Sequence, residues 1–191
     1  MGWKAFNLFA TVRDESYLTS FPPPLPERAR EFLKLLGGTF RSEGATTLEK
    51  GLYPAGNDEL YVGAYEGAFV LGSIPITEEA FAGVVPKAVT CVNTMLPGCR
   101  VLIVLLHSVV DLFGYAIFEH NRLVRARAGS ADSGVYVDFG DLLPIERKLK
   151  AFDDTIDGEE LVMEICRPFI GCRIDEYNSW DLGMELFRRS R

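Results

Sequence analysis

The chain has 191 residues, a formal net charge of −7 and a pI of about 4.9. A phosphate backbone needs a basic binding face, so this charge argues against a nucleic-acid partner, and it also disfavours an anionic membrane surface. No apolar run reaches the ~20 residues of a membrane helix, and the start lacks a signal-peptide pattern. We therefore expect a cytoplasmic protein with no membrane association.

The first half of the chain combines strands with helices. Its expected elements are a strand over residues 4–12, a helix from Pro26 to Leu36, a hairpin over 59–73, and a helix capped by Thr77. Gly37 and Gly38 are suited to end the first helix in left-handed conformations. Pro86 either kinks the later helix or opens a second one that runs to Leu96.

The second half begins as a meander of strands and ends in helices. The expected strands are 101–106, 112–119, 122–128 and 135–139, and the expected helices are 145–152, 159–166 and 180–189. This order predicts an α+β fold with a largely antiparallel mixed sheet and helices packed on one face. We divide the chain into a single domain over residues 1–174 and a C-terminal helical extension over 175–191.

The segment "LHSVVD" holds the first candidate site. His107 and Ser108 follow each other on a strand, so their side chains point apart and cannot form a nucleophile and its base. His107 and Asp111 make a better pair, because a bend can bring the carboxylate onto the imidazole and create a general base. The alternative, which we favour, is that Ser108 and Asp111 satisfy backbone donors at the bend, with His107 hydrogen-bonded beneath the sheet.

Three arginines of the strand after the His120-Asn121 turn form the second candidate. Arg125 and Arg127 share one strand face, and with Arg122 and Ser108 they make a candidate binding site for an anion. The alternative, again favoured, is a strand face whose arginines pair with Glu119 or Asp138 on neighbouring strands.

No metal site or cofactor is expected. Asp153, Asp157 and Glu164 fall at positions of a calcium-loop pattern, but Glu160 stands where such loops need an apolar residue. The simpler interpretation is that Asp157 caps a helix and Glu160 completes a capping box. The four cysteines form no CxxC pair and are expected to be free thiols.

Three segments, "MGWKAFNLF", "LHSVVDLFGYAIFEHNRLVRARAGSADSGVYVDFGD" and "GEELVMEICRPFIGCRI", resemble an uncharacterised bacterial family that carries a domain of unknown function. The resemblance spans about half of the chain. It implies a bacterial cytosolic protein and marks for testing the positions His107, Ser108, Asp111, Arg122 and Arg125. At the turn, His120-Asn121 replaces the Asp-Gly of that family, and the segment from Asp175 onward departs from it.

Two functions remain open. No Walker loop, dinucleotide fingerprint or metalloprotease motif is present, and the chain has only two histidines. We therefore expect a non-catalytic protein-binding domain that recognises a basic protein partner, as immunity proteins neutralise a basic toxin. The alternative is a hydrolase or transferase that uses His107 and Asp111 as an acid–base pair. The sequence does not indicate an oligomeric state.

Overall fold

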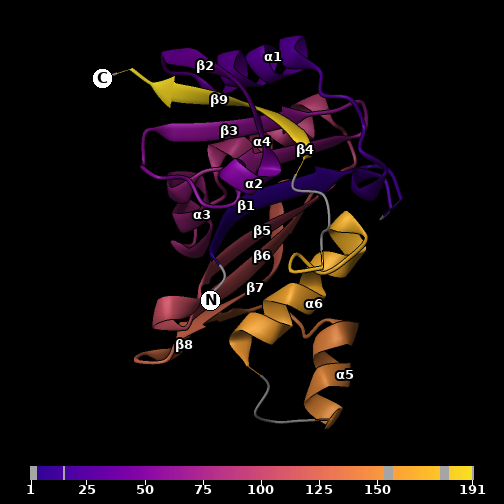
Figure 1. The fold of residues 1–191 in the computed structure, drawn as a ribbon. Coiled ribbons are helices and arrows are strands. Elements are labelled where there is room, and N and C mark those ends of the chain that lie inside the picture. The colour runs from indigo at the N-terminus through magenta and orange to yellow at the C-terminus, as the bar shows by residue number, and fades with distance from the viewer. Residues whose placement is uncertain (1–3, 15, 153–156, 177–180, 191) are drawn as a thin grey trace.

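The computed structural model describes residues 4–14, 16–152, 157–176 and 181–190. Within them the chain forms one open sheet (Figure 1). Its strands are β1 (Lys4–Thr11), β2 (Phe40–Thr47), β3 (Glu59–Ala64), β4 (Ala68–Gly72), β5 (Arg100–His107), β6 (Leu112–Glu119), β7 (Arg122–Ser130), β8 (Gly134–Phe139) and β9 (Gly183–Arg189). Their order across the sheet is β2-β9-β3-β4-β1-β5-β6-β7-β8.

Every neighbouring pair in this sheet is antiparallel. The prediction of an α+β fold with an antiparallel sheet is therefore confirmed. The strands β1 and β5 pair along their whole lengths, from Lys4 opposite His107 to Thr11 opposite Arg100. Both are almost entirely buried, which explains the continuous apolar run of β5.

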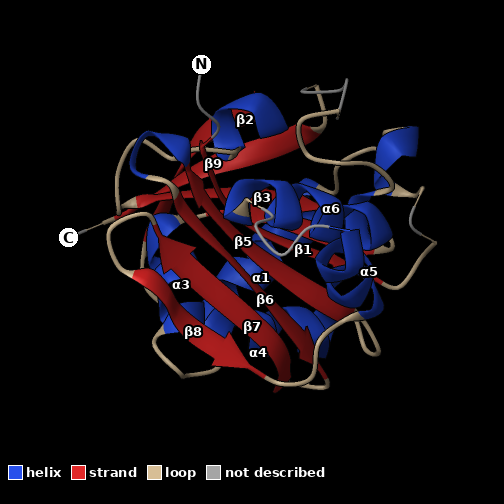
Figure 2. Ribbon diagram, turned by 90° about the horizontal axis from the view of Figure 1, so that it is seen from below, coloured by secondary structure: helices blue, strands red, loops and turns tan. Residues whose placement is uncertain are grey.

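The helices cover both faces of the sheet rather than the single face that was expected (Figure 2). They are α1 (Pro26–Leu36), α2 (Leu48–Gly51), α3 (Ile74–Phe81), α4 (Lys87–Met95), α5 (Pro144–Phe152) and α6 (Gly158–Ile170), with short 3-10 helices η1 (Leu18–Ser20) and η2 (Ser108–Val110). Helices α1, α3 and α4 pack on one face, and α2, α5 and α6 on the other. Central strands apolar on both sides require this second layer, because a one-sided arrangement would leave their other side in water.

The C-terminal segment corrects a second expectation. In the described part of the expected helix over 180–189, residues Gly183–Arg189 form strand β9, which lies between β2 and β3. Residue 180 is outside the described residues. Met184 and Phe187 are buried on opposite faces of the sheet. Two apolar residues three positions apart fit the pattern of one helix face, which explains the helix prediction. In a β-strand, residues three apart point to opposite faces, so Met184 packs into the core on one side of the sheet and Phe187 into the core on the other.

Two helix ends differ in detail from the sequence prediction, and at Pro86 one of the two stated alternatives is confirmed. Helix α3 begins at Ile74 with Ser73 at its N-cap, four residues before the expected cap at Thr77. Pro86 does open a second helix, as one of the two alternatives held. Pro168 does not end α6, which continues to Ile170 and stops at the left-handed Gly171. Among the described helices, none is both long and apolar enough to cross a lipid bilayer.

Candidate functional site

The corner between β5 and β6 contains the first set of candidate residues. His107 ends β5, η2 occupies the bend, and Asp111 adopts a left-handed conformation with φ of 46°. The Asp111 backbone N–H donates to the carbonyl of Ser108 at 3.3 Å and closes the turn. Aspartate tolerates this conformation better than most residues, which explains its place here.

The imidazole of His107 packs edge-on against the ring of Tyr53, with 6.1 Å between the ring centroids. Its Nδ1 is buried without a hydrogen-bond partner among the described residues, so the hydrogen bond expected beneath the sheet is not formed at this atom. Within that part of the chain, no hydrogen bond or ion pair joins His107 to Asp111. The expected imidazole–carboxylate contact is therefore not formed, and the corner lacks the contact that would fix the imidazole tautomer for general-base catalysis.

Ser108 is directed toward α6 and away from His107. Its hydroxyl donates to Oε2 of Glu159 at 2.5 Å, so the side chain links the β5–β6 corner to the first turn of α6. Gly158 belongs to the same junction, because its backbone lies directly against the ring of Phe113. The Ser108 hydroxyl thus binds a carboxylate, a contact that the sequence analysis did not predict.

Arg125 is the largest fully buried side chain among the described residues, with 0% exposure. Its Nε and Nη2 donate to the two carboxylate oxygens of Glu146 at 2.9 and 2.6 Å. Its Nη1 donates to Asp138 at 2.5 Å and to the carbonyls of Phe139 and Gly140. The guanidinium thus connects helix α5 and the end of β8 to β7. Its N–H donors bind acceptors of the protein rather than a ligand.

This cluster shifts the protonation of its members. Burial alone would lower the pKa of Arg125 and raise the pKa of Glu146, but their mutual hydrogen bonds outweigh burial in both. The result is a raised pKa for Arg125 and a lowered pKa for Glu146. The hydroxyl of Tyr115 is also buried here, and burial, followed by the nearby Glu146, raises its pKa. An anion from solution would have to displace Glu146 to reach Arg125.

The other two arginines do not join Arg125 in a clamp. Arg127 donates to Oδ2 of Asp138 at 3.3 Å, as the pairing alternative predicted, and its Nε is buried without a partner among the described residues. Arg122 is exposed and lies opposite Glu119 in the β6–β7 ladder. Glu119 itself binds Arg100 at 2.9 Å. The structure therefore separates Arg122 from the pair that shares Asp138.

At the start of α6, the capping interpretation is confirmed for Asp157. Its side chain accepts a hydrogen bond from the N–H of Glu159 at 3.0 Å. Asp153 lies outside the described residues. Within the described part of the chain, no group of three or more acidic, histidine or cysteine residues is arranged to hold a metal ion. The four cysteines are free thiols.

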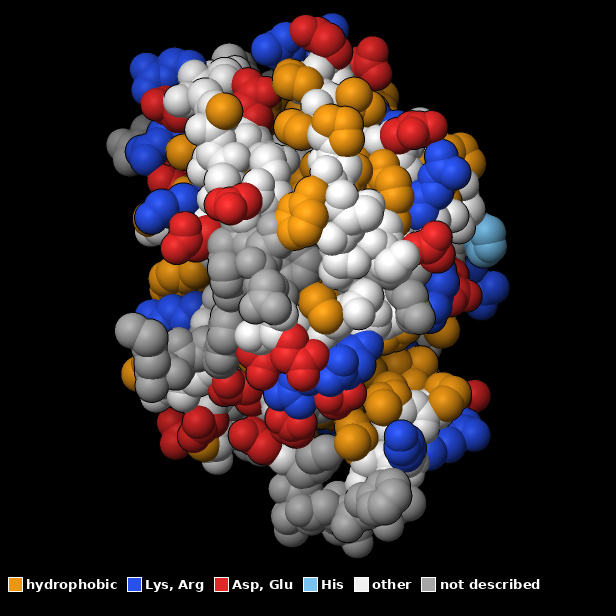
Figure 3. Space-filling model, turned by 45° about the vertical axis from the view of Figure 1, so that its right-hand side comes forward, with side chains coloured by type: hydrophobic (Ala, Val, Ile, Leu, Met, Phe, Trp, Pro, Cys, Tyr) orange, Lys and Arg blue, Asp and Glu red, His pale blue; other side chains and the backbone are white. Residues whose placement is uncertain are grey.

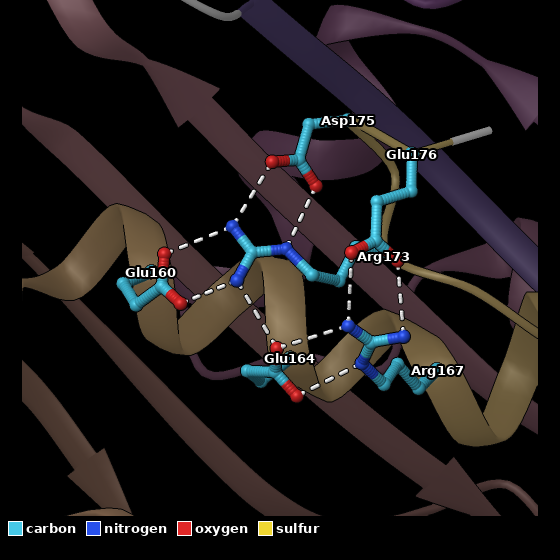
Figure 4. Close-up of polar contacts among 6 residues, drawn as sticks. All are labelled: Glu160, Glu164, Arg167, Arg173, Asp175 and Glu176. Atoms are coloured by element: carbon cyan, nitrogen blue, oxygen red, sulfur yellow. Dashed lines mark hydrogen bonds and ion pairs between the residues drawn. The ribbon is translucent and has the colours of Figure 1, made fainter. Parts of the chain in front are cut away.

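An ion-pair cluster that the sequence analysis missed holds α6 to the segment after it (Figure 4). Arg173 contacts Glu160, Glu164 and Asp175, while Arg167 contacts Glu164 and Glu176. Glu160 therefore pairs with Arg173 and does not complete the expected capping box. Helical spacing places Glu160, Glu164 and Arg167 on one face, which is the one signal in the sequence that pointed to this cluster. On the molecular surface, acidic and basic side chains are intermixed in this region (Figure 3).

The β5–β6 corner also carries two exposed apolar side chains, one of which is the most exposed large apolar side chain of the described residues. Val109 is 73% exposed and Val110 is 53% exposed. Asp111 follows them directly, and Glu159 is tied to the same turn through Ser108. We call Val109, Val110, Asp111, Asp157 and Glu159 the acidic corner. None of its three carboxylates forms an ion pair within the described residues.

Comparison with known proteins places the chain in a family without an assigned activity. The model of a family of unknown function, DUF6928, matches residues 8–165, and the chain belongs to this family. The match spans β1 to the middle of α6 and stops before β9. Searches of curated proteins and of solved structures find no significant match.

Proposed function

We propose that the chain is a non-catalytic binding protein that recognises a basic protein partner through the acidic corner. The observation that carries this proposal is the pair of exposed valines, Val109 and Val110, beside three carboxylates without ion-pair partners. An exposed apolar centre with a polar rim is the usual composition of a protein interface. The rim of this corner is acidic, so the matching surface is basic.

Charge supports the same partner at longer range. The net charge of −7 attracts a basic protein before contact and raises the rate of encounter. The valines would then supply the buried apolar area that slows dissociation. In this role the chain acts as an immunity-type protein of a bacterial cytosol, which neutralises a basic toxin by covering its functional surface.

The engagement of the other candidate residues supports binding over catalysis. Arg125 is saturated by Glu146, Asp138 and backbone carbonyls, so it is poorly placed to hold a substrate anion. Ser108 serves as a link to Glu159, which fixes one carboxylate of the rim beside η2. Both arrangements favour a rigid surface, and a rigid surface loses little conformational entropy on binding.

The test compares a corner variant with a matched control. Val109→Lys with Asp111→Asn removes apolar area and charge from the corner, and asparagine retains the left-handed conformation at position 111. Val135→Lys with Asp132→Asn makes the same changes at another exposed site, near β8. The wild type is used to capture its partner from the source organism, and the captured protein is then purified for titration.

We expect a captured protein with a high pI whose affinity falls at least about tenfold, or 1.4 kcal/mol, with the corner variant. Its association rate should fall as ionic strength rises. The control variant should bind within about twofold of the wild type, since distant sites act independently. An acidic partner, or a partner that binds the corner variant as tightly as the wild type, would refute the proposal.

A further inference from the structure

A cavity of about 160 Å³ lies between α3, α4 and one end of the sheet. We call it the α3–α4 cavity, and it shares no residue with the acidic corner. It is bounded by the start of β3, the end of β9 and the first residues of α3 and α4, all along one side of the molecule (Figure 1). Its lining mixes charges of both signs with apolar side chains.

Two cations without ion-pair partners among the described residues converge at this cavity. They are Lys87, the first residue of α4, and Arg189, the last of β9. A Cβ on Gly37 would lie 3.1 Å from the ammonium of Lys87, and a Cβ on Gly38 would lie 3.5 Å from Nε of Arg189. Consecutive Cα atoms are about 3.8 Å apart, so both cations flank the same dipeptide. Two neighbouring positive charges that are not within ion-pair distance of a carboxylate favour an anion between them.

Ser73 contributes a side-chain hydroxyl that does not cap helix α3. It lines the cavity, is only 6% exposed, and occupies the N-cap position of α3 without capping it. Its backbone N–H donates to Phe6, but its hydroxyl makes no hydrogen bond to any described residue. Because the hydroxyl makes no hydrogen bond within the described residues, it is available to donate to a ligand oxygen in the cavity.

Carboxylates line the cavity as well. Glu79 forms no ion pair within the described residues, and Asp58 forms only a long ion pair there, with Arg188 at 4.0 Å. The third carboxylate, Glu59, is already engaged by Arg188 at 2.7 Å and by the N–H of Ala55 at 2.8 Å. Glu79 and Asp58 are therefore the groups available to receive a cationic part of a ligand.

The geometry points to a small zwitterion, and we propose that the α3–α4 cavity binds a free α-amino acid with an aliphatic side chain. Lys87, Arg189 and the Ser73 hydroxyl hold the α-carboxylate, and Glu79 with Asp58 receives the α-ammonium. The aliphatic side chain rests on Leu60 and Ile76, which line the cavity with Leu36 and Pro75. The volume limits the ligand to a small molecule and excludes a folded partner.

The experiment titrates the full chain by calorimetry with L-valine and with three partial analogues. Isovalerate supplies the carboxylate alone, isobutylamine supplies the ammonium alone, and inorganic phosphate supplies only an anion. We expect saturable binding of L-valine that is at least about tenfold tighter than binding of each analogue, because each analogue leaves charged groups of the site without a partner. If no analogue or amino acid binds, or if phosphate binds as well as L-valine, the proposal is overturned.

Three variants test the assignment of residues. Lys87→Gln and Ser73→Ala should each weaken L-valine at least about fivefold, as loss of one hydrogen bond to a charged group predicts. The Tm of Ser73→Ala should stay close to that of the wild type, since the hydroxyl caps nothing. The control is Lys50→Gln, on α2 at the opposite face of the sheet. Unchanged L-valine affinity in both site variants, or an equal loss in the control, would also overturn the proposal.

Discussion

At the scale of single residues, Arg125 is the side chain whose role differs most from its appearance in the sequence. It looks like part of an exposed arginine strand, yet it is the buried centre of an ion cluster. Its charge is tolerable only because two carboxylates and three backbone carbonyls surround it. A buried ion pair of this kind is sensitive to loss of either partner and less sensitive to loss of both.

We therefore predict that Arg125→Met lowers the free energy of unfolding by about 3–5 kcal/mol, because it leaves the Glu146 carboxylate buried and unpaired. The double variant Arg125→Met with Glu146→Met should recover part of this loss. Arg122→Met, at an exposed position of the same strand, should change stability by less than about 0.5 kcal/mol. Urea denaturation of the four proteins measures these differences, and a larger loss in the double variant would contradict the interpretation.

The lowered pKa of Glu146 adds a pH dependence. Its carboxylate is ionised in both states above its ordinary value of 4.5, so its stabilising effect is complete there and disappears as the pH falls through the lower folded-state value. We predict that Glu146→Gln costs about 2 kcal/mol at neutral pH and progressively less in acid. Denaturation curves at a series of pH values check this, and a difference that grows toward low pH would contradict it.

The sequence could predict the β7 strand but not the partner of Arg125. Alternation correctly placed Arg125 and Arg127 on one face and suggested Asp138 as a neighbour, because adjacent strands of a meander are close in sequence. Glu146 comes from a helix packed across the sheet, and no local pattern encodes which helical carboxylate reaches a buried strand position. The missing contact between His107 and Asp111 has a similar origin, since the turn around η2 is set by packing against α6.

At the scale of elements, α6 depends on its ion-pair cluster for its connection to the following segment. Arg173 is 15% exposed and bridges Glu160, Glu164 and Asp175, whereas Arg167 is 43% exposed. Asp175 and Glu164 have lowered pKa values; the hydrogen bond from Arg173 dominates for Asp175, and those from Arg167 and Arg173 outweigh burial for Glu164. The more enclosed arginine should therefore contribute more to stability.

We predict that Arg173→Met destabilises the fold by about 2 kcal/mol, while Arg167→Met costs no more than about 0.5–1 kcal/mol, because exposed pairs are screened by solvent. Thermal unfolding of both variants at low and high salt provides the measurement. Equal losses in the two variants, or a loss for Arg173→Met that salt abolishes, would show that the cluster is a solvated surface feature.

At the scale of the whole molecule, β9 joins the edge strand β2 to the rest of the sheet. It pairs with β2 on one side and β3 on the other, so β2 is attached to the remaining strands of the sheet through β9. No local sequence signal could reveal this position, because the pairing partners are far apart: Ser42 binds Glu185 across 143 residues. Hydrophobic periodicity describes only neighbouring residues and does not report pairing between distant segments. For this reason the segment predicted as a helix is an internal strand in the structure.

We predict that Phe187→Ala, which removes a ring that is 2% exposed in the core beside β2, lowers stability by about 3–5 kcal/mol. Phe139→Ala removes the same ring from a position that is 51% exposed, and its effect should be below about 1 kcal/mol. Hydrogen exchange should show the amides of β2 and β9 losing protection together in the first variant. Protection of β2 that survives the loss of β9 protection would contradict this dependence.

The central place of β9 has a consequence for synthesis of the chain. On the ribosome, β2 emerges long before β9 is translated, and until then the backbone hydrogen-bonding edge that pairs with β9 has no partner. A nascent chain in that state exposes the unpaired edge of β3 as well, and exposed edges promote association between chains. Slow translation between β2 and β9 would lengthen this exposure. The need for chaperones should therefore increase with the time that the ribosome takes to reach residue 183, where β9 begins.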